Sequence, residues 1–224
     1  MEKKNIFSRV LLGLSLVLMV ATLYLIFLFV PTEESMGIVQ RIFYFHVPLA
    51  WVSFLAFFIV FLGSILYLWK RNSKWDIMAS SSAEVGAVFT TLFLITGSIW
   101  AKPIWGVWWT WSPRLTTALV LWLIYLAYLL VRAYASDDQR GARFAAIVGI
   151  IGFIDVPIVA LAITLWRTQH PGPVVFTSGL APSMLLTLLV SLAAFTALFL
   201  ILVTQVARLK KDRDEIMRLK ELLR

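Results

Sequence analysis

The chain contains no cysteine among its 224 residues. Disulfides, thiolate metal ligands, thiol catalysis and thioether attachment of a prosthetic group to this chain are therefore excluded. Charge is also scarce, because 14% of the residues are charged while 61% are hydrophobic. A soluble domain has roughly a quarter of its residues charged. The composition thus excludes an ordinary soluble protein and indicates a chain that is solvated mainly by lipid.

Acidic residues are the rarer charge, since 12 Asp and Glu stand against 20 Lys and Arg, for a formal net charge of +8. A basic balance of this kind can indicate binding to nucleic acid. Here, however, the basic residues lie at the edges of long apolar runs. We therefore expect a lipid bilayer as their environment and no nucleic acid partner.

Six apolar segments reach the length of about 20 residues that a spanning helix needs, and they lack the alternation of barrel strands. We predict an all-α integral membrane protein with six transmembrane helices in a single membrane domain covering residues 1–224. The first segment follows a short basic stretch but exceeds the roughly 7–15 apolar residues of a signal peptide, so we expect an uncleaved anchor. The expected spans are 10–30, 48–69, 83–100, 115–135, 142–166 and 180–206, followed by a basic amphipathic cytoplasmic tail at 207–224.

Lysine and arginine gather on one side of the predicted bundle. Because cytoplasmic loops are enriched in these residues, we predict that both termini are cytoplasmic. Both histidines and most prolines fall in the opposite, outer loops, where we expect the functional site. Of the 20 basic residues, the outer loops hold Arg41, Lys102, Arg114 and Arg167.

The most distinctive outer stretch reads WAKPIWGVWWTWSPRLT at residues 100–116, with five tryptophans in twelve residues. Tryptophan is common at membrane interfaces, but anchoring one loop needs only one or two. Because Trp105, Trp108 and Trp109 have helical i, i+3, i+4 spacing, we predict a short interfacial helix that carries them on one face. We also predict that Gly37–Val47 lies in the interface and that Pro48 separates it from the second span.

The only two histidines, His46 and His170, lie in outer loops before and after the tryptophan-rich stretch. Imidazole is a common metal ligand, and haem iron takes two axial donors on opposite faces of the porphyrin. Indole rings stack favourably on such a flat π-system. A zinc site would need three or four protein ligands. Haem ligation and a structural interfacial role both remain open for these histidines.

Three outer arginines lie beside these candidate elements, and each could donate to a carboxylate such as a haem propionate. Interfacial solvation is the alternative role for them. They are Arg41, Arg114 and Arg167.

Asp155 falls in the middle of the fifth span, two residues before Pro157. An intramembrane carboxylate suggests function, but we favour a structural role at a helix kink. A small-solute transporter or channel would need several such groups, which argues against that alternative. An enzyme that attaches haem is a third reading, for which no nucleophile or acid–base pair is evident beyond the histidines.

Three sequences resemble the tryptophan-rich haem-handling membrane proteins of cytochrome c biogenesis. They are FYFHVPLAW around His46, WGVWWTWSPRLT at 105–116 and LWRTQHPGP around His170. The chain length and the six spans are similar to one branch, the haem exporter protein C (CcmC) family. The resemblance implies haem b as the cofactor, with His46 and His170 as axial ligands. It also implies that Trp105, Trp108, Trp109 and Trp111 form a platform for haem and a chaperone.

The resemblance further implies a place in the bacterial inner membrane, with the site facing the periplasm, and no enzymatic activity of its own. The implied partners are a membrane-anchored periplasmic haem chaperone, the membrane and ATPase subunits of an ABC-type transporter, and a small single-span membrane subunit. One position departs from the family motif, which commonly has aspartate where this chain has Ser112. Ser112 could instead cap a helix that begins with Pro113.

Overall fold

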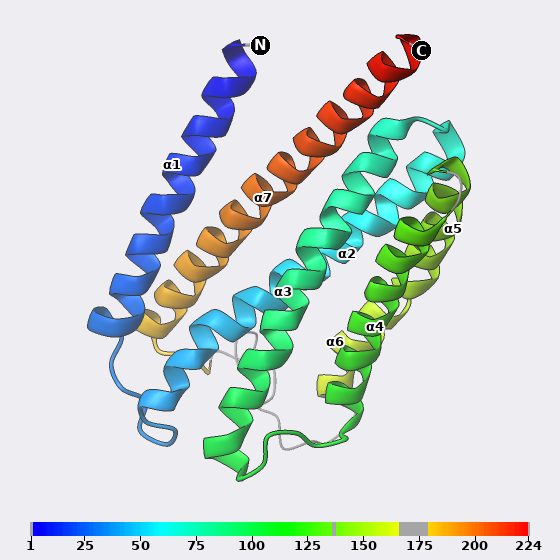
Figure 1. Cartoon of the computed structure of the whole chain (residues 1–224). Helices are drawn as coiled ribbons and strands as arrows, with labels where there is room; N and C mark the ends of the chain where they lie inside the picture. Colours follow the sequence, from blue (N-terminus) through cyan, green and yellow to red (C-terminus); the bar gives the residue numbers. More distant parts are fainter. Residues whose placement is uncertain (1, 136–137, 166–178, 224) are drawn as a thin grey trace.

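The computed structural model describes residues 2–135, 138–165 and 179–223, and nearly all of them are helical. Helix α1 runs on into a short π-helical stretch, and a 3-10 helix precedes α2 (Figure 1). The helices are α1 (Glu2–Tyr24), η1 (Leu25–Phe29), η2 (Ile38–Ile42), α2 (Phe43–Lys70), α3 (Ser73–Trp105), α4 (Pro113–Tyr134), α5 (Asp138–Gly152), α6 (Asp155–Leu165) and α7 (Pro182–Leu222).

Six helical segments of the described chain are long and apolar enough to cross a membrane, which confirms the predicted all-α class. Two of them, the segment with α2 and the segment with α3, have 33 residues each, and α7 has 41. At 1.5 Å per residue these helices exceed the roughly 30 Å hydrocarbon core. The segments are Ser8–Phe29, Ile38–Lys70, Ser73–Trp105, Pro113–Tyr134, Gln139–Ala162 and Pro182–Leu222.

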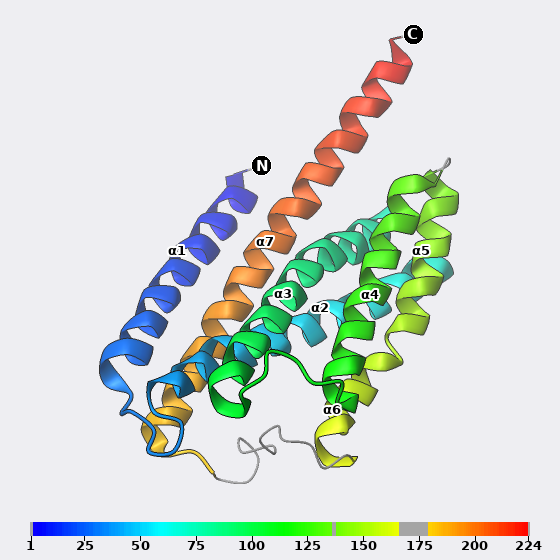
Figure 2. The same cartoon turned by 60° about the horizontal axis from the view of Figure 1, so that its bottom comes forward.

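Helices α2 and α3 pack along each other at the centre of the bundle, α1 packs on α7, and α4 packs on α5 and α6 (Figures 1 and 2). Close approach of α2 and α3 depends on small residues, since a Cβ at Gly86 would lie 2.7 Å from the Cβ of Ala56. Small residues let transmembrane helices approach in this way. The core between α2 and α4 includes the stacked rings of Phe57 and Tyr125, whose centroids lie 3.5 Å apart.

The helix boundaries differ from the sequence expectation at three places. Helix α2 begins at Phe43 and passes through Pro48, so the predicted break at Pro48 is wrong. A transmembrane helix tolerates the lost backbone donor when neighbouring groups compensate. The predicted continuous span 142–166 is interrupted between Gly152 and Asp155, and the span predicted at 83–100 is the longer helix α3, Ser73–Trp105. The predicted amphipathic tail is a helical extension of the last span, since α7 continues to Leu222.

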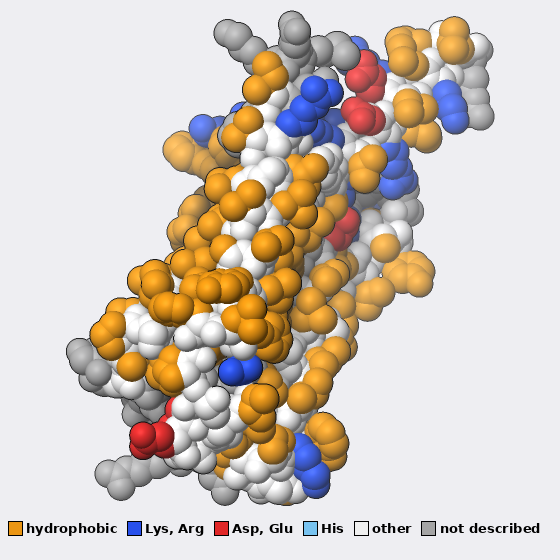
Figure 3. Space-filling model, turned by 90° about the vertical axis from the view of Figure 1, so that its left-hand side faces the viewer, with side chains coloured by type: hydrophobic (Ala, Val, Ile, Leu, Met, Phe, Trp, Pro, Cys, Tyr) orange, Lys and Arg blue, Asp and Glu red, His pale blue; other side chains and the backbone are white. Residues whose placement is uncertain are grey.

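Both ends of the described chain lie at one end of the molecule, together with the α2–α3 turn (Figure 1). The face with α1 and α7 presents mostly hydrophobic side chains over its middle, with basic side chains gathered toward the end that carries the termini (Figure 3). An apolar middle between polar ends is the surface expected of a membrane-spanning bundle.

Two ion pairs tie α3 to its neighbours at the end that carries the termini. The Arg132 guanidinium on α4 donates to both carboxylate oxygens of Asp76, at 2.8 and 2.6 Å. The Lys210 ammonium on α7 lies 2.7 Å from Glu84 and donates to the Ser80 hydroxyl at 2.7 Å. These pairs connect α3 to α4 and to α7 on the side of the termini, and the candidate site lies at the other end of α3.

Candidate functional site

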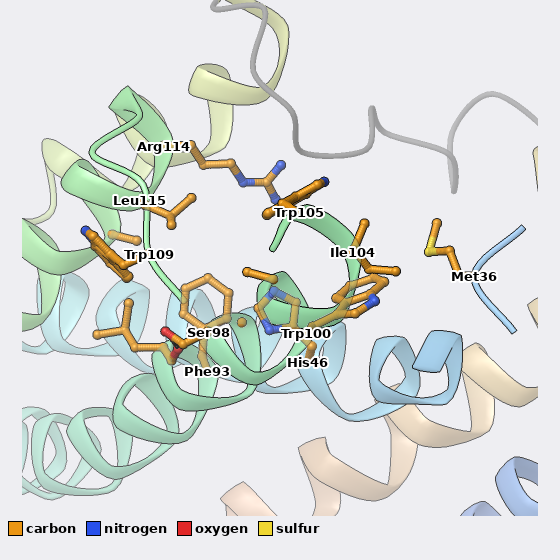
Figure 4. A pocket seen from close by; sticks show the side chains of 14 residues that line it. Met36, His46, Phe93, Ser98, Trp100, Ile104, Trp105, Trp109, Arg114 and Leu115 are labelled. Atoms are coloured by element: carbon orange, nitrogen blue, oxygen red, sulfur yellow. Dashed lines mark hydrogen bonds between the residues drawn. The ribbon is translucent and has the colours of Figure 1, made fainter. Parts of the chain in front are cut away.

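A pocket lies at the end of the bundle opposite the termini, between α2, α3, α4 and the loop 107–112 (Figure 4). It contains about 620 Å³ of empty space, including its open mouth. Its walls are mainly apolar with a few polar groups, as is typical of small-molecule sites. The lining residues are Met36, His46, Phe93, Leu94, Gly97, Ser98, Trp100, Ala101, Ile104, Trp105, Trp109, Arg114, Leu115 and Ala118.

His46 lies in the wall of this pocket in the first turn of α2, with only 6% of its surface exposed. Its ring packs against Phe93 and Trp100 of α3, with centroid distances of 4.8 and 5.7 Å. Gly97 lies against the ring edge, since a Cβ there would lie 2.9 Å from His46 Cε1. Three residues of α3, which are Phe93, Gly97 and Trp100, therefore confine the imidazole.

The tryptophans divide into two groups by their exposure. Trp105 and Trp109 line the pocket, whereas Trp108 and Trp111 are 57% and 75% exposed. The predicted short helix with Trp105, Trp108 and Trp109 on one face is wrong. Trp105 is the last residue of α3, and residues 107–112 are not helical.

Glycine and proline explain this division. Gly106 has a φ of 77°, a left-handed conformation that glycine adopts readily, and it ends α3. Pro113 is the first residue of α4, where its missing N–H costs nothing. The loop between them is held by Lys102, whose ammonium donates to the Gly106 carbonyl at 2.8 Å and lies 6.0 Å from the Trp108 ring centroid. The rings of Trp109 and Trp111 meet edge to face.

Ser112 occupies the N-cap position of α4 as predicted, but its side chain makes no capping hydrogen bond. Its buried hydroxyl has no hydrogen-bond partner among the described residues. The start of α4 is therefore set by Pro113 and by the Thr116 N–H, which donates to the Ser112 carbonyl at 3.0 Å.

Of the three predicted arginines, Arg114 in the first turn of α4 lines the pocket. In Figure 4, Arg114 and Trp105 lie on one side of the cavity, and His46 and Phe93 lie on the other. Arg41 lies in the 3-10 helix η2 and is not part of the pocket lining. Arg167 and His170 lie outside the described residues.

A compact turn before α2 brings Met36 to the pocket. The Glu33 carboxylate accepts hydrogen bonds from the Met36 N–H and from the Ser35 hydroxyl, and the Gly37 N–H donates to the Glu33 carbonyl at 3.0 Å. These donors, the Met36 N–H most of all, hold the pKa of Glu33 below its usual 4.5. The turn is therefore stabilised by an ionised carboxylate at neutral pH.

Sequence reasoning missed the α3 side of the pocket. Phe93, Gly97, Trp100 and Ile104 recur at helical spacing and lie on the face of α3 that lines the cavity. Periodicity along α3 could have grouped them, but it could not have paired them with His46, because no spacing rule links α2 to α3 at this point.

Asp155 lies in the first turn of α6, beside the interruption after α5, and its buried Oδ2 has no hydrogen-bond partner among the described residues.

The pocket combines an imidazole, a guanidinium and several flat indoles. The buried indole N–H groups of Trp100 and Trp109 lack hydrogen-bond partners among the described residues, which leaves two donors for a ligand. Such a site suits a flat apolar molecule that carries carboxylates and accepts a nitrogen ligand. The fold and the site thus define a multi-pass membrane protein with an aromatic ligand pocket at one end of its helix bundle.

Comparison with known proteins specifies this class further. Residues 2–221 match the model of the CcmC family, described as "Heme exporter protein C", and the chain belongs to this family. Heme exporter protein C of Bradyrhizobium diazoefficiens is 37% identical over 191 residues, which cover 84% of this chain and 71% of that protein. Heme exporter protein C of Escherichia coli strain K12 is 35% identical over 157 residues, which cover 70% of this chain and 64% of that protein.

A mitochondrial relative extends the comparison beyond bacteria. The "putative cytochrome c biosynthesis ccmC-like mitochondrial protein" of Marchantia polymorpha is 32% identical over 204 residues, which cover 89% of this chain and 87% of that protein. Family membership assigns this chain to the multi-pass inner-membrane components that handle haem for cytochrome c maturation, and not to the enzymes.

Proposed function

We propose that the chain holds haem b in the pocket between α2, α3, α4 and the loop 107–112, and delivers it to a membrane-anchored haem chaperone. In this proposal the pocket opens toward the periplasm of a bacterial inner membrane. Haem is the cargo of the protein and not a group that it uses for catalysis.

The observation that carries this proposal is the burial of His46 in the wall of an aromatic pocket that also contains Arg114. Haem iron needs an imidazole donor, and the porphyrin plane needs apolar and aromatic walls. The propionates need cationic or N–H donors, which Arg114 and the indole N–H groups of Trp100 and Trp109 can supply. The donor set of the pocket therefore fits haem.

His170 is proposed as the second axial ligand. It lies outside the described residues, and the proposal rests on the resemblance of the sequence around it to the family. Arg41 and Arg167 are proposed as further cationic groups at the mouth of the site. Arg41 is supported by its buried Nε, which has no hydrogen-bond partner among the described residues.

The exposed part of loop 107–112 is proposed as the docking surface for the chaperone. Val107, Trp108 and Trp111 present exposed apolar side chains next to the pocket. The other proposed partners are the membrane and ATPase subunits of an ABC-type transporter and a small single-span membrane subunit. These subunits are proposed to contact the cytoplasmic continuation of α7 beyond residue 206. It lies on the side of the membrane opposite the pocket and carries exposed Leu209, Ile216 and Leu219.

The ligand assignment is tested by haem titration of the purified protein. We expect a low-spin, six-coordinate spectrum in the wild type, because two imidazoles bind the iron. His46→Ala and His170→Ala should each abolish that spectrum. If the Soret and α bands are unchanged in both variants, these histidines are not the axial ligands.

The tryptophan assignment is tested with a matched pair from the same loop. Trp109→Ala removes a pocket wall and should weaken haem binding, whereas Trp111→Ala removes an exposed ring and should leave haem affinity unchanged. Transfer of haem to an isolated chaperone should be slowed by Trp111→Ala. Equal haem affinities of the two variants would contradict the division into pocket and docking residues.

A further inference from the structure

The hydrogen bond between His46 and Thr96 indicates whether Nδ1 of His46 carries a proton. Nδ1 of His46 lies 3.1 Å from Oγ1 of Thr96, a residue on the facing helix α3. The same Oγ1 lies 2.8 Å from the Leu92 carbonyl and 3.1 Å from the Phe93 carbonyl. A hydroxyl has one proton to donate and lone pairs to accept with, while a carbonyl can only accept.

Only one arrangement satisfies all three contacts. The Thr96 hydroxyl donates toward the carbonyls of its own helix, and its lone pair accepts a proton from His46 Nδ1. In the opposite arrangement the hydroxyl would donate to Nδ1, and its oxygen would face the Leu92 carbonyl oxygen at 2.8 Å without a proton between them. That oxygen–oxygen contact is repulsive, so the geometry favours an imidazole that is protonated at Nδ1.

The residues around the His46 ring also oppose turning the ring over. Phe93 and Trp100 pack against the ring, and Gly97 leaves no space beyond its Cε1 edge. Turning the ring over would replace Nδ1 by a carbon opposite Thr96 and would lose the hydrogen bond. The imidazole is therefore held in one orientation as well as in one tautomer.

We propose that Thr96 is a positioning residue that keeps His46 protonated at Nδ1 and so presents the lone pair of Nε2 to haem iron. The part that concerns iron rests on the proposed function, whereas the tautomer is a property of the chain itself. A hydrogen bond from the far nitrogen of a ligating histidine orients the ring and raises its basicity as a ligand. Thr96 would thus act on the iron through His46 without touching it.

The tautomer is tested first in the haem-free, full-length protein in detergent micelles. Only two histidines are present, so ¹⁵N-histidine labelling in a His170→Ala background gives signals from His46 alone. The spectra are recorded at about pH 8, above the ordinary histidine pKa of about 6.5. Long-range ¹⁵N–¹H correlations then show which nitrogen is protonated.

We expect the Nδ1–H tautomer in the parent and in Thr96→Ser, which keeps the hydroxyl. Thr96→Val keeps the shape but cannot accept a proton, so the preference for Nδ1–H should be lost. Thr90→Val is the matched control, because the Thr90 hydroxyl lies on the same helix and donates to the Gly86 carbonyl instead of contacting His46. An Nε2–H tautomer in the parent, or an unchanged Nδ1–H tautomer in Thr96→Val, would overturn the proposal. If His170→Ala does not fold, the two histidines are assigned in the wild type by comparison with Thr96→Val.

The consequence for the iron is tested separately by haem titration and potentiometry. Loss of such a partner typically lowers metal affinity by about 10–100-fold. We expect a loss in this range and a higher midpoint potential for Thr96→Val, with values near the wild type for Thr96→Ser and Thr90→Val. Unchanged affinity and potential in Thr96→Val would remove the positioning role. If His46→Ala leaves the haem spectrum unchanged, the ligand assignment fails, while the tautomer measured in the haem-free protein still stands or falls by itself.

Discussion

The side chains around His46 show how much the site depends on volume at single positions. A Cβ at Gly97 would lie 2.9 Å from His46 Cε1, closer than real Cβ contacts allow. The ring cannot simply move aside, because Phe93 and Trp100 pack against it. The absence of a side chain at Gly97 is therefore a requirement of the histidine position and not a consequence of backbone freedom, since Gly97 lies within a regular helix.

Gly97→Ala is therefore expected to displace the His46 ring and to weaken haem binding. Overfilling a packed site costs about 1–3 kcal/mol of folding free energy, and haem affinity would fall by roughly 5–150-fold where the whole cost falls on the haem-bound state. Gly13→Ala is the control, since it is also a helical glycine but has open space around the added Cβ. The measurement is the haem dissociation constant of each variant. Equal constants for Gly97→Ala and Gly13→Ala would show that the ring is not confined as described.

Residue chemistry was easier to predict than residue orientation. The sequence singled out His46, Trp105, Trp109 and Arg114, because imidazole, indole and guanidinium groups are unusual at this density in an apolar chain. The structure places all four in the lining of one pocket. The sequence also grouped Trp108 with Trp105 and Trp109, since helical spacing cannot reveal that α3 ends at Trp105. Trp111 was added to the group by the family resemblance. Thr96 and Gly97 gave no chemical signal at all. Their roles come from the packing of α3 on α2.

At the scale of elements, apolar length predicted the six membrane-spanning segments well, because each must cross the same hydrocarbon thickness. Interruptions were predicted poorly. Pro48 was expected to break a helix that continues through it, and no break was expected between Gly152 and Asp155. Whether a proline or glycine interrupts a membrane helix depends on which neighbouring groups satisfy the freed backbone, and that is a tertiary property.

Helix α3 links the pocket to the opposite end of the bundle, where Lys210 attaches α7 to it. Lys210 lies 2.7 Å from both Glu84 and the Ser80 hydroxyl, while the neighbouring Lys211 is exposed. Lys210→Met should lower stability by about 1 kcal/mol, since the pair is partly exposed. For a chain of this size that corresponds to about 2–4 °C in the unfolding midpoint.

Lys211→Met removes the same charge from the next position and serves as the control. Its unfolding midpoint in detergent should equal that of the wild type. Hydrogen exchange in residues 207–222 should increase in Lys210→Met only, because that variant loses the polar contacts of Lys210 with Glu84 and Ser80 on α3. A common midpoint for both variants would mean that the Lys210 contacts do not hold α7.

At the scale of the whole molecule, the two ends of the bundle differ in chemistry. The end that carries the termini holds the basic α7 continuation and the ion pairs of Asp76 and Glu84, while the opposite end holds the aromatic pocket. A charge asymmetry of this kind orients membrane proteins, because basic segments are retained in the cytoplasm. The pocket would then face the periplasm, where the proposed chaperone has access to it.

This orientation can be tested directly, since a chain without cysteine accepts single cysteine probes on an otherwise unreactive background. Val107→Cys introduces a probe in the exposed loop beside the pocket, and Lys211→Cys introduces one on the exposed part of α7. In intact cells whose outer membrane is permeable to the reagent, a charged maleimide should label Val107→Cys and not Lys211→Cys. Both variants should be labelled once the inner membrane is opened. Labelling of Lys211→Cys alone in intact cells would show that the bundle has the opposite orientation. The pocket would then face the cytoplasm, where a periplasmic chaperone could not reach it.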